Sequence, residues 1–439
     1  MALLLFISLI ILFALGVPVA FSMGLSSILA MSNEGILIQV AVQKIFSSMN
    51  SFPLMAIPFF ILAGSLMEAG GISKRLIDFA NSLVGKLTGG LAMVTVVTAM
   101  FFSSISGSSA ATVAAIGSIL IPAMVKRGFP RNFSTSIQAV SGELGVIIPP
   151  SIPMIIFALT AGVSISIGDL FMAGVVPGIL IGGSIMLTIY VISKVKGYGN
   201  RTPLNLTDSE VLEESLLMTT KGRLNAFKNA ILPLLMPVII LGGIYGGVFT
   251  PTEAAAVAVA YAYILGAFVY RSLTINSIME VLRNSVLSTA IIMFIIANAG
   301  LLGWVLTAEK VPATVSQWFI AVSDSPIIFL LLVNLLLLIV GMFLETGAAI
   351  VIMAPILTPV AISFGIDPVH FGIIMIVNLA VGMLTPPIGV NLFVACQIGK
   401  LRIDQILKPL IPFYIVLLVD ILLISFLPQI SLWLPSFLK

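Results

Sequence analysis

Residues Phe101–Gly117 read "FFSSISGSSAATVAAIG", and they concentrate polar side chains in a chain that otherwise avoids them. Five serines and one glycine fall within the seven residues Ser103–Ser109. Hydroxyls at a Gly-containing turn between apolar arms indicate a helical hairpin whose tip lies at membrane depth. Non-helical backbone is tolerated there only where it is buried in protein or lines a watery cavity. The plainer alternative is that these small residues only let transmembrane helices pack closely.

The composition predicts an all-α polytopic membrane protein. Of the 439 residues, 59% are hydrophobic and 8% charged, whereas a soluble domain carries about 25% charged residues. Apolar runs long enough to cross the roughly 30 Å hydrocarbon core recur, for example Ile327–Leu344 and Leu410–Leu427. The apolar N-terminus lacks a basic region, so we expect a retained membrane segment rather than a signal peptide. Leu3–Met31 is either one long helix or a pair broken at Gly16–Pro18, which leaves the side of the N-terminus open.

The rare residue types exclude several classes of site. One cysteine, Cys396, excludes a disulfide framework and a cysteine-rich metal site. One histidine, His370, argues against a structural zinc site and a histidine-based catalytic triad, and we expect it to be structural. We therefore expect a protein that is not an enzyme and that binds no transition metal. We also expect no nucleic-acid partner, because the net charge of +3 does not indicate binding to nucleic acid.

Basic residues predict the topology, because Lys and Arg concentrate in cytoplasmic loops. Lys86 and Lys126 both belong inside, so the apolar residues between them predict a re-entrant hairpin near 90–125 that turns at Ser106–Ser109. Two full crossings with a short outer loop are the alternative. A second hairpin, near 327–363, is expected to enter from outside. The five basic groups are Lys74 to Lys86, Lys126 to Arg131, Lys194 to Lys228, Arg271 with Arg283, and Lys400 to Lys408, which leaves Lys44, Lys310 and Lys439.

A repeated motif supports the two hairpins. "ILIPAMVKRGFP" matches "ILTPVAISFGID", and "GELGVIIPPSIP" matches "VGMLTPPIGVN". The two copies start on opposite sides of the membrane by the charge argument, so they form an inverted-topology repeat with broken helices near 131–162 and 370–396. Such repeats are typical of secondary transporters, with the binding site near the midplane. The paired positions, at one constant offset, are Ile119/Ile356, Leu120/Leu357, Pro122/Pro359, Gly128/Gly365, Gly145/Gly382, Pro149/Pro386 and Pro150/Pro387.

Hydroxyls and freed carbonyls together predict two sodium sites. Proline removes an N–H and clashes with the carbonyl four residues back, which frees carbonyls near each Pro-Pro pair. Hard oxygen ligands without net charge suit Na⁺. The predicted sodium ligands are Ser103, Ser106, Gly145 and Ile148 in the first copy, and Gly341, Thr346, Gly382 and Thr385 in the second.

Helix N-termini at the hairpin tips favour an anionic solute between them. For Asn298 and Asn391, polar residues in apolar helices, contact with the solute and hydrogen bonding between helices are equally favoured interpretations. The predicted solute-binding residues are Ser104, Ser108, Ser109, Pro150, Asn298, Thr346 and Asn391.

Ionisable residues within spans are costly and therefore functional candidates. These are Glu143, Glu345 and Asp420. We expect Glu345, at the second hairpin tip, to pair with backbone N–H groups, with the sensing of a proton or cation as the alternative. Glu143 is expected to cap N–H groups freed at the break after it. Glu253 has a structural explanation, since "TPTE" at Thr250–Glu253 is a capping box with Pro at the first helical position.

Four segments resemble the large membrane subunit of tripartite ATP-independent periplasmic (TRAP) transporters: "SSISGSSAATVAAIGSILIPAM", "GELGVIIPPSIPMIIFA", "GGIYGGVFTPTEAAAVAVAYA" and "NLAVGMLTPPIGVNLFVA". The resemblance covers nearly the whole chain. It implies Na⁺-coupled uptake of an organic acid across the bacterial inner membrane, together with a periplasmic substrate-binding protein and a separate small membrane subunit. It also implies an elevator, in which a scaffold carries a mobile transport domain. Sialic acid and C4-dicarboxylates are both candidate solutes, and these motifs do not separate them.

The predicted organisation follows from the hairpins and the resemblance. Residues 52–165 and 285–398 form the two halves of the transport domain. An N-terminal scaffold covers 1–51, scaffold helices with a cytoplasmic linker at 194–228 cover 166–284, and a C-terminal scaffold helix covers 399–439. A binding-protein-independent Na⁺/dicarboxylate carrier of related fold is the closest alternative function. A channel and an intramembrane enzyme are the others.

Overall fold

The structure is a computed structural model that describes residues 1–199, 220–322 and 324–438. Within these ranges every regular element is a helix. Nine of the described helices are long and apolar enough to cross a membrane, and a bent pair, Arg131–Ile147 with Ile152–Thr160, makes up to ten. The predicted all-α polytopic class is therefore confirmed. Residues 200–219 of the predicted linker lie outside the described residues.

The N-terminal helices settle one open question. Leu3–Met31 is a pair of helices, broken at Gly16 (φ 77°) and Pro18, which pack against each other. A short helix and a 3₁₀ turn then lead into two longer helices. The elements of this segment are α1 (Ala2–Ala14), α2 (Val19–Asn33), α3 (Ile38–Met49), η1 (Phe52–Met55), α4 (Ala56–Ala69) and α5 (Ile72–Val84).

The first repeat is a helical hairpin followed by a broken helix. The first arm of the hairpin ends where Gly107 adopts a left-handed conformation (φ 64°) and donates its N–H to the carbonyl of Ser103. Ser108 then caps the second arm by accepting from the N–H of Ala111 at 3.5 Å. The elements are α6 (Gly90–Ser106), α7 (Ser109–Lys126), α8 (Arg131–Gly142), α9 (Leu144–Ile147) and α10 (Ile152–Thr160).

The second repeat has the same order. Its hairpin turns at Leu344 and Glu345, and its broken helix is interrupted over residues 383–389. The elements are α17 (Pro326–Phe343), α18 (Thr346–Ser363), α19 (Pro368–Gly382) and α20 (Val390–Gly399).

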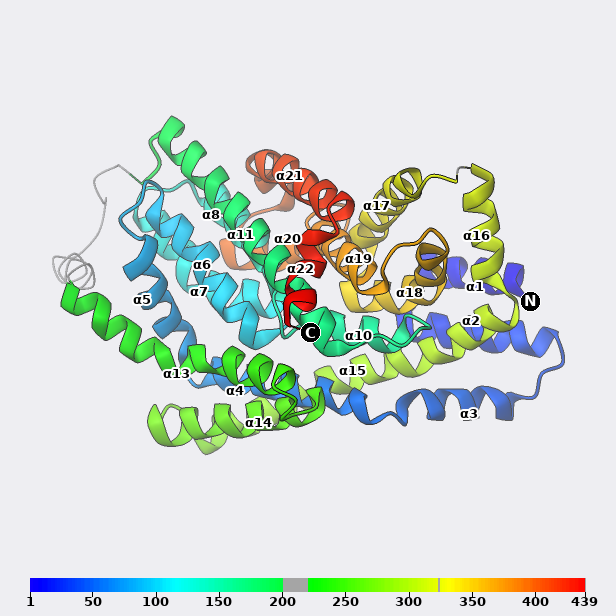
Figure 1. Ribbon diagram of the computed structural model, residues 1–439. Coiled ribbons are helices and arrows are strands. Elements are labelled where there is room, and N and C mark those ends of the chain that lie inside the picture. Colours follow the sequence, from blue (N-terminus) through cyan, green and yellow to red (C-terminus); the bar gives the residue numbers. More distant parts are fainter. Residues whose placement is uncertain (200–219, 323, 439) are drawn as a thin grey trace.

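The remaining described helices connect and flank the repeats. The long helix α15 runs along the lower side of the molecule in Figure 1, with α3 and α4 beside it and the broken helices above. The predicted capping box at Glu253 is present at the start of α14. The elements are α11 (Ile167–Lys196), α13 (Thr220–Tyr245), α14 (Pro251–Ile264), the π-helical turn η2 (Leu265–Val269), α15 (Ile275–Ala308), α16 (Val311–Val322), α21 (Ile403–Phe426) and α22 (Gln429–Leu438).

The two repeats pack across each other in a reciprocal way. The second half of each broken helix lies against the second arm of the opposite hairpin, so that α10 packs on α18 and α20 packs on α7. Helix α11, which we expected in the scaffold, packs against α6, α9, α19 and α21. The division into scaffold and transport domain stays a prediction.

A buried polar network anchors the second broken helix to the C-terminal helices. Asn378 donates to Asn334 at 2.9 Å, and Asn334 donates to the hydroxyl of Ser425 at 3.0 Å. One ring nitrogen of His370 lies 3.0 Å from the hydroxyl of Ser431 and the other lies 3.3 Å from the carbonyl of Ser425. Each pairing satisfies polar groups that would otherwise be costly in a buried apolar setting.

Candidate functional site

The tip of the first hairpin sits in the break of the first broken helix. The carbonyl of Gly107 accepts from the N–H of Ile152 at 3.4 Å. A Cβ atom at Gly107 would stand 2.9 Å from the carbonyl oxygen of Pro150. Only glycine fits here, because its φ is left-handed and the opposing atom belongs to the backbone. We call this contact between the tip and the break the first junction.

Gly145 closes the first junction from the other side. A Cβ atom at this position would lie 2.5 Å from the carbonyl oxygen of Ser108 and 2.8 Å from the Cα of Ser109. One turn of helix later, Ile148 leaves helical geometry with ψ 127°. The predicted sodium ligands Gly145 and Ile148 therefore flank a break whose backbone touches the hairpin tip.

The serines of the tip take different places. Ser103 is fully buried, and its hydroxyl has no hydrogen-bond partner among the described residues. Ser104 uses its hydroxyl locally, donating to the carbonyl of Phe101 at 2.7 Å. Ser106 and Ser108 line a cavity that is described below. Ser103 therefore places a buried hydroxyl oxygen without a protein partner one turn before Gly107, beside the first junction.

The second junction repeats this arrangement. A Cβ atom at Gly341 would lie 2.9 Å from the Cα of Gly382, so α17 and α19 touch through their backbones. Thr346 is fully buried, and its hydroxyl points to the sulfur of Met383 at 3.5 Å. Thr385 lies in the break, where its N–H donates to the carbonyl of Gly382 at 2.8 Å. The structure thus brings together all four residues predicted for the second sodium site.

A buried hydrogen bond links the two broken helices. The amide nitrogen of Asn391, at the start of α20, donates to a carboxylate oxygen of Glu143 at 2.6 Å. Glu143 directly precedes α9, and both side chains are fully buried. The expectation that Glu143 caps freed N–H groups is wrong, because among the described residues its side chain accepts no N–H of α9. One carboxylate oxygen bonds Asn391, and the other has no hydrogen-bond partner there. This bond joins the starts of two half-helices that come from opposite repeats.

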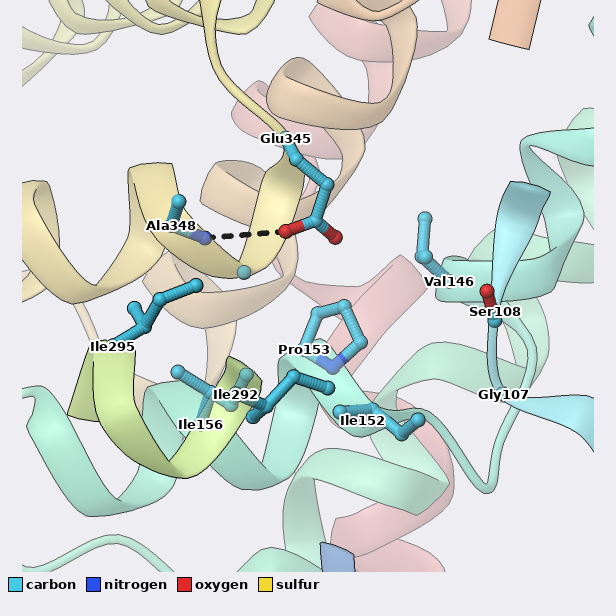
Figure 2. Close-up of a pocket in the computed structure, with 11 residues that line it drawn as sticks. Gly107, Ser108, Val146, Ile152, Pro153, Ile156, Ile292, Ile295, Glu345 and Ala348 are labelled. Atoms are coloured by element: carbon cyan, nitrogen blue, oxygen red, sulfur yellow. Dashed lines mark hydrogen bonds between the residues drawn. The ribbon is translucent and has the colours of Figure 1, made fainter. Parts of the chain in front are cut away.

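A central cavity lies between the two hairpin tips (Figure 2). Its empty space is about 440 Å³. Ser108, the N-cap of α7, borders it together with residues of the first turns of α10 and α18, so three helix N-termini converge there. Two isoleucines of α15 also line it. The lining residues are Gly107, Ser108, Val146, Ile152, Pro153, Ile156, Ile292, Ile295, Glu345, Gly347 and Ala348.

The sequence identifies the family. Residues 6–430 match the family described as "Tripartite ATP-independent periplasmic transporter, DctM component". The chain belongs to this TRAP transporter family. It is the large permease type, and it is a multi-pass protein of the bacterial inner membrane.

Curated TRAP relatives differ in the solute that their names give. The isethionate TRAP transporter permease protein DctMQ of Oleidesulfovibrio alaskensis is 44% identical over 95% of this chain, which spans 64% of that relative's length. The C4-dicarboxylate large permease DctM of Pseudomonas aeruginosa is 44% identical over 90% of this chain and 89% of its own length. The sialic acid large permease SiaM of Vibrio cholerae is 37% identical over 96% of this chain and 95% of its own length.

A solved transporter structure shares the fold. The YdaH transporter of Alcanivorax borkumensis superposes with a TM-score of 0.62, and 90% of this chain covers 88% of that chain at 15% identity. At this identity the likeness concerns the fold alone.

A second cavity of the TRAP permease, about 620 Å³, adjoins the central one. The two share Ser108, Ile152 and Ile292, and the second extends toward Glu68 on α4 and Ser288 on α15. Sequence reasoning missed these wall residues. The isoleucines look like any other apolar membrane residue, and only the polar residues in apolar helices, Glu68 and Ser288, carried a usable signal.

Three candidate residues, Asn298, Glu345 and Asp420, make hydrogen bonds to other groups of the protein. Glu345 lines the central cavity, whereas Asn298 and Asp420 do not. Asn298 donates to the carbonyl of Phe294 at 2.9 Å, and its side-chain oxygen lies against Gly24 of α2. The carboxylate of Glu345 accepts from the N–H of Ala348 at 3.4 Å, so the predicted pairing with backbone N–H groups is present (Figure 2). Asp420 accepts a hydrogen bond from the hydroxyl of Ser184.

Proposed function

We propose that this TRAP large permease carries an organic acid anion into the cell in symport with Na⁺. The observation that supports this most is the repeated junction, in which a hairpin tip meets a helix break on each side of one central cavity. In secondary transporters, unwound carbonyls at such breaks coordinate Na⁺, and half-helix N-termini face anionic solute groups. The hydroxyls of Ser103, Thr346 and Thr385 and the backbone carbonyls at the two junctions are uncharged oxygens of the kind that suits Na⁺, which supports the same assignment.

The cavity suits an anion because of the helix ends around it. An α-helix N-terminus carries roughly half a positive charge together with free N–H groups. Glu345 and Ser108 each accept one N–H of the first turns of α18 and α7. We propose that the solute meets the remaining N–H groups at these N-termini and at that of α10. Ser108 lines the cavity and Ser109 begins α7, so we propose both as solute contacts.

Reciprocal packing supports an inverted repeat and an elevator movement. The pairing of α10 with α18 and of α20 with α7 is what two copies of opposite orientation would produce around a shared axis. The central cavity is bounded on one side by the two tips and on the other by α15. We propose that the tips and broken helices slide as a unit along α15, carrying Na⁺ and solute across.

The proposed partners are a small membrane subunit and a periplasmic substrate-binding protein. The proposal follows from membership in the tripartite TRAP family. The relatives name isethionate, a C4-dicarboxylate and sialic acid, all of them organic acids. We propose an organic acid anion of this kind as the solute.

Uptake into proteoliposomes tests the proposal. The permease would be reconstituted with its small subunit, and radiolabelled succinate and sialic acid offered with and without the binding protein and an inward Na⁺ gradient. We expect uptake of one solute only when both the binding protein and Na⁺ are present. Uptake without a binding protein would instead identify a Na⁺/dicarboxylate carrier. A sustained current that does not depend on the Na⁺ gradient would identify a channel. Chemical turnover of the solute would identify an enzyme.

Loss of hydroxyls at the first junction is expected to weaken Na⁺ activation. In the variant Ser103→Ala/Ser106→Ala, the Na⁺ concentration for half-maximal uptake should rise about tenfold, which corresponds to about 1.4 kcal/mol of lost Na⁺ binding. Folding should change little, because small hydroxyls contribute little packing. The measurement is the initial uptake rate as a function of external Na⁺.

The controls use the symmetry of the site. Ser118→Ala removes an exposed hydroxyl of α7 that donates only to the carbonyl of Ala115, and it should leave Na⁺ activation unchanged. Thr346→Ala with Thr385→Ala should shift Na⁺ activation as the first pair does. Unchanged activation in Ser103→Ala/Ser106→Ala would remove the first sodium site from the proposal.

A further inference from the structure

A separate cavity lies farther along the seam between α10, α15 and α18. Its empty space is about 750 Å³, and it shares no lining residue with the central cavity. On all three helices its wall residues follow those of the central cavity, as with Ile295 and then Ile296 on α15. The residues that matter for its chemistry are Ser48, Ser51, Thr160, Gly300, Gly303 and Thr307. We call it the outer cavity.

The name follows from the charges of α15. This helix has 34 residues, which at 1.5 Å per residue is about 50 Å and enough to cross the membrane. Arg271 and Arg283 mark its beginning as cytoplasmic. Gly300, Gly303 and Thr307 lie near its other end, so the cavity that they line lies toward the periplasm.

Small residues keep the outer cavity open. A Cβ atom at Gly300 would collide with the hydroxyl of Ser48, so α3 and α15 touch at that point. By contrast, a Cβ atom at Gly303 would meet no atom within 4 Å. A Cβ atom at Gly303 would therefore enter open space at the wall of the outer cavity.

A lysine lies near the outer cavity, next to two of its lining positions, although it does not line the cavity itself. Lys44 lies one turn before Ser48 on α3, with its Nζ 5.6 Å from the centre of the Trp304 ring on α15. Among the described residues no carboxylate forms an ion pair with it. Glu309, at the end of α15, is instead paired with the amino group of Met1 at 3.5 Å. The charge of Lys44 is thus available to an anion that enters from outside.

The hydroxyls of the outer cavity can each turn toward a solute. Ser48 donates to the carbonyl of Lys44 at 2.7 Å, and Thr160 and Thr307 donate within their own helices at 2.8 Å. Those carbonyls lie in helices and belong to the backbone ladder, so a hydroxyl that rotates to a solute leaves little unsatisfied. A cavity of this size with a few convergent polar groups has the dimensions of a small-molecule site.

We propose that the outer cavity is a second binding site, which holds a small organic carboxylate beside Lys44 before it reaches the central cavity. The ligand class rests on the proposed function, whereas the location and the charge preference rest on the cavity itself. Ile156 and Ile295 lie in the wall of the central cavity next to the outer one, so an apolar layer separates the two. A solute bound in the outer cavity would lie between α10, α15 and α18, along the path that we propose for the hairpin tips.

Charge-matched labelling of a cysteine tests this site without knowledge of the solute. Gly303→Cys would be made in a full-length chain with the buried Cys396 replaced by Ala, in right-side-out membrane vesicles. The probes are the anionic 2-sulfonatoethyl and the cationic 2-trimethylammonioethyl methanethiosulfonates. We expect labelling from outside, with the anionic reagent favoured. Lys44→Gln should reduce that preference about fivefold, because it removes the positive charge that we propose to attract the anion; a fivefold change corresponds to about 1 kcal/mol. Millimolar L-malate should slow labelling by the anionic reagent.

Ser32→Cys, an exposed position at the same end of α2 as Glu34, is the control. It should show no preference for the anionic reagent, and Lys44→Gln should not change its labelling. Equal labelling of Gly303→Cys by both reagents, or no effect of Lys44→Gln, would overturn the site. So would labelling that is insensitive to malate. Failure of Na⁺ coupling alone would leave these labelling results intact, so the two proposals fail separately.

Filling the outer cavity gives a second measurement. Gly303→Leu places a side chain into empty space, and it should raise the KM for uptake more than it lowers kcat. Gly242→Leu is the matched control, because a Cβ atom at this glycine of α13 also meets no atom within 4 Å and it lines none of the cavities described above. Uptake kinetics that are the same in Gly303→Leu and Gly242→Leu would overturn a place for the cavity on the solute's path.

Discussion

Gly382→Ala is expected to abolish most of the uptake activity of the permease. The added Cβ would stand 2.7 Å from the Cα of Gly341 and 2.9 Å from the carbonyl oxygen of Leu338. Both opposing atoms belong to the backbone of α17, so no side chain can move aside, and the hairpin must separate from the broken helix. Overpacking of this kind costs about 1–3 kcal/mol. We expect the initial uptake rate to fall roughly tenfold or more, since about 1.4 kcal/mol is a factor of ten.

Gly183→Ala is the matched control for this prediction. Gly183 lies within α11, and a Cβ atom there would meet no atom within 4 Å. The same change in side chain should therefore leave uptake and the midpoint of thermal unfolding close to those of the unaltered protein. Normal uptake by Gly382→Ala would show that the second sodium site works without the close approach of α17 and α19.

Local signals explain why the hairpin tips and helix breaks could be predicted. Gly107 marks a left-handed turn and the Pro-Pro pairs mark breaks, because each residue restricts or frees its own backbone whatever surrounds it. The capping box at Thr250–Glu253 is a pattern of the same local kind. The assignment to the polytopic membrane proteins could also be predicted from the sequence, because hydropathy is summed over a window of residues and does not depend on how the helices pack.

Contacts between distant residues explain what could not be predicted. Asn391 and Glu143 are 248 residues apart, and nothing in either segment indicates the other as a partner. The sequence was equally consistent with solute contact and with hydrogen bonding between helices for Asn391. Only the three-dimensional packing of α20 shows its bond to Glu143. Cavity walls made of isoleucine, such as Ile292, are invisible for another reason, because an apolar side chain in a membrane helix looks the same whether it faces lipid, protein or solute.

Asn391→Leu is expected to destabilise the protein strongly. The substitution leaves the carboxyl group of Glu143 fully buried with no partner, and stranding a buried polar group in this way costs about 1–3 kcal/mol, more when the group is charged. The midpoint of thermal unfolding in detergent should fall by several degrees, and the yield of folded protein with it. Glu143→Gln should be tolerated far better, since a glutamine amide can still accept from Asn391 and can also donate to its unpaired side-chain oxygen.

The double variant Glu143→Leu/Asn391→Leu separates the cost of a broken pair from the value of the bond. Replacing both partners by apolar groups removes the unpaired carboxyl, so its thermal midpoint should lie above that of Asn391→Leu alone. Transport should nevertheless stay low in the double variant, because α9 and α20 would no longer be tied together at the point where both helices are interrupted. Recovery of stability without recovery of uptake would assign the bond to positioning the two junctions. Recovery of both would reduce it to a packing contact that leucine replaces, and no recovery of stability would mean that the loss in Asn391→Leu does not arise from the stranded carboxyl.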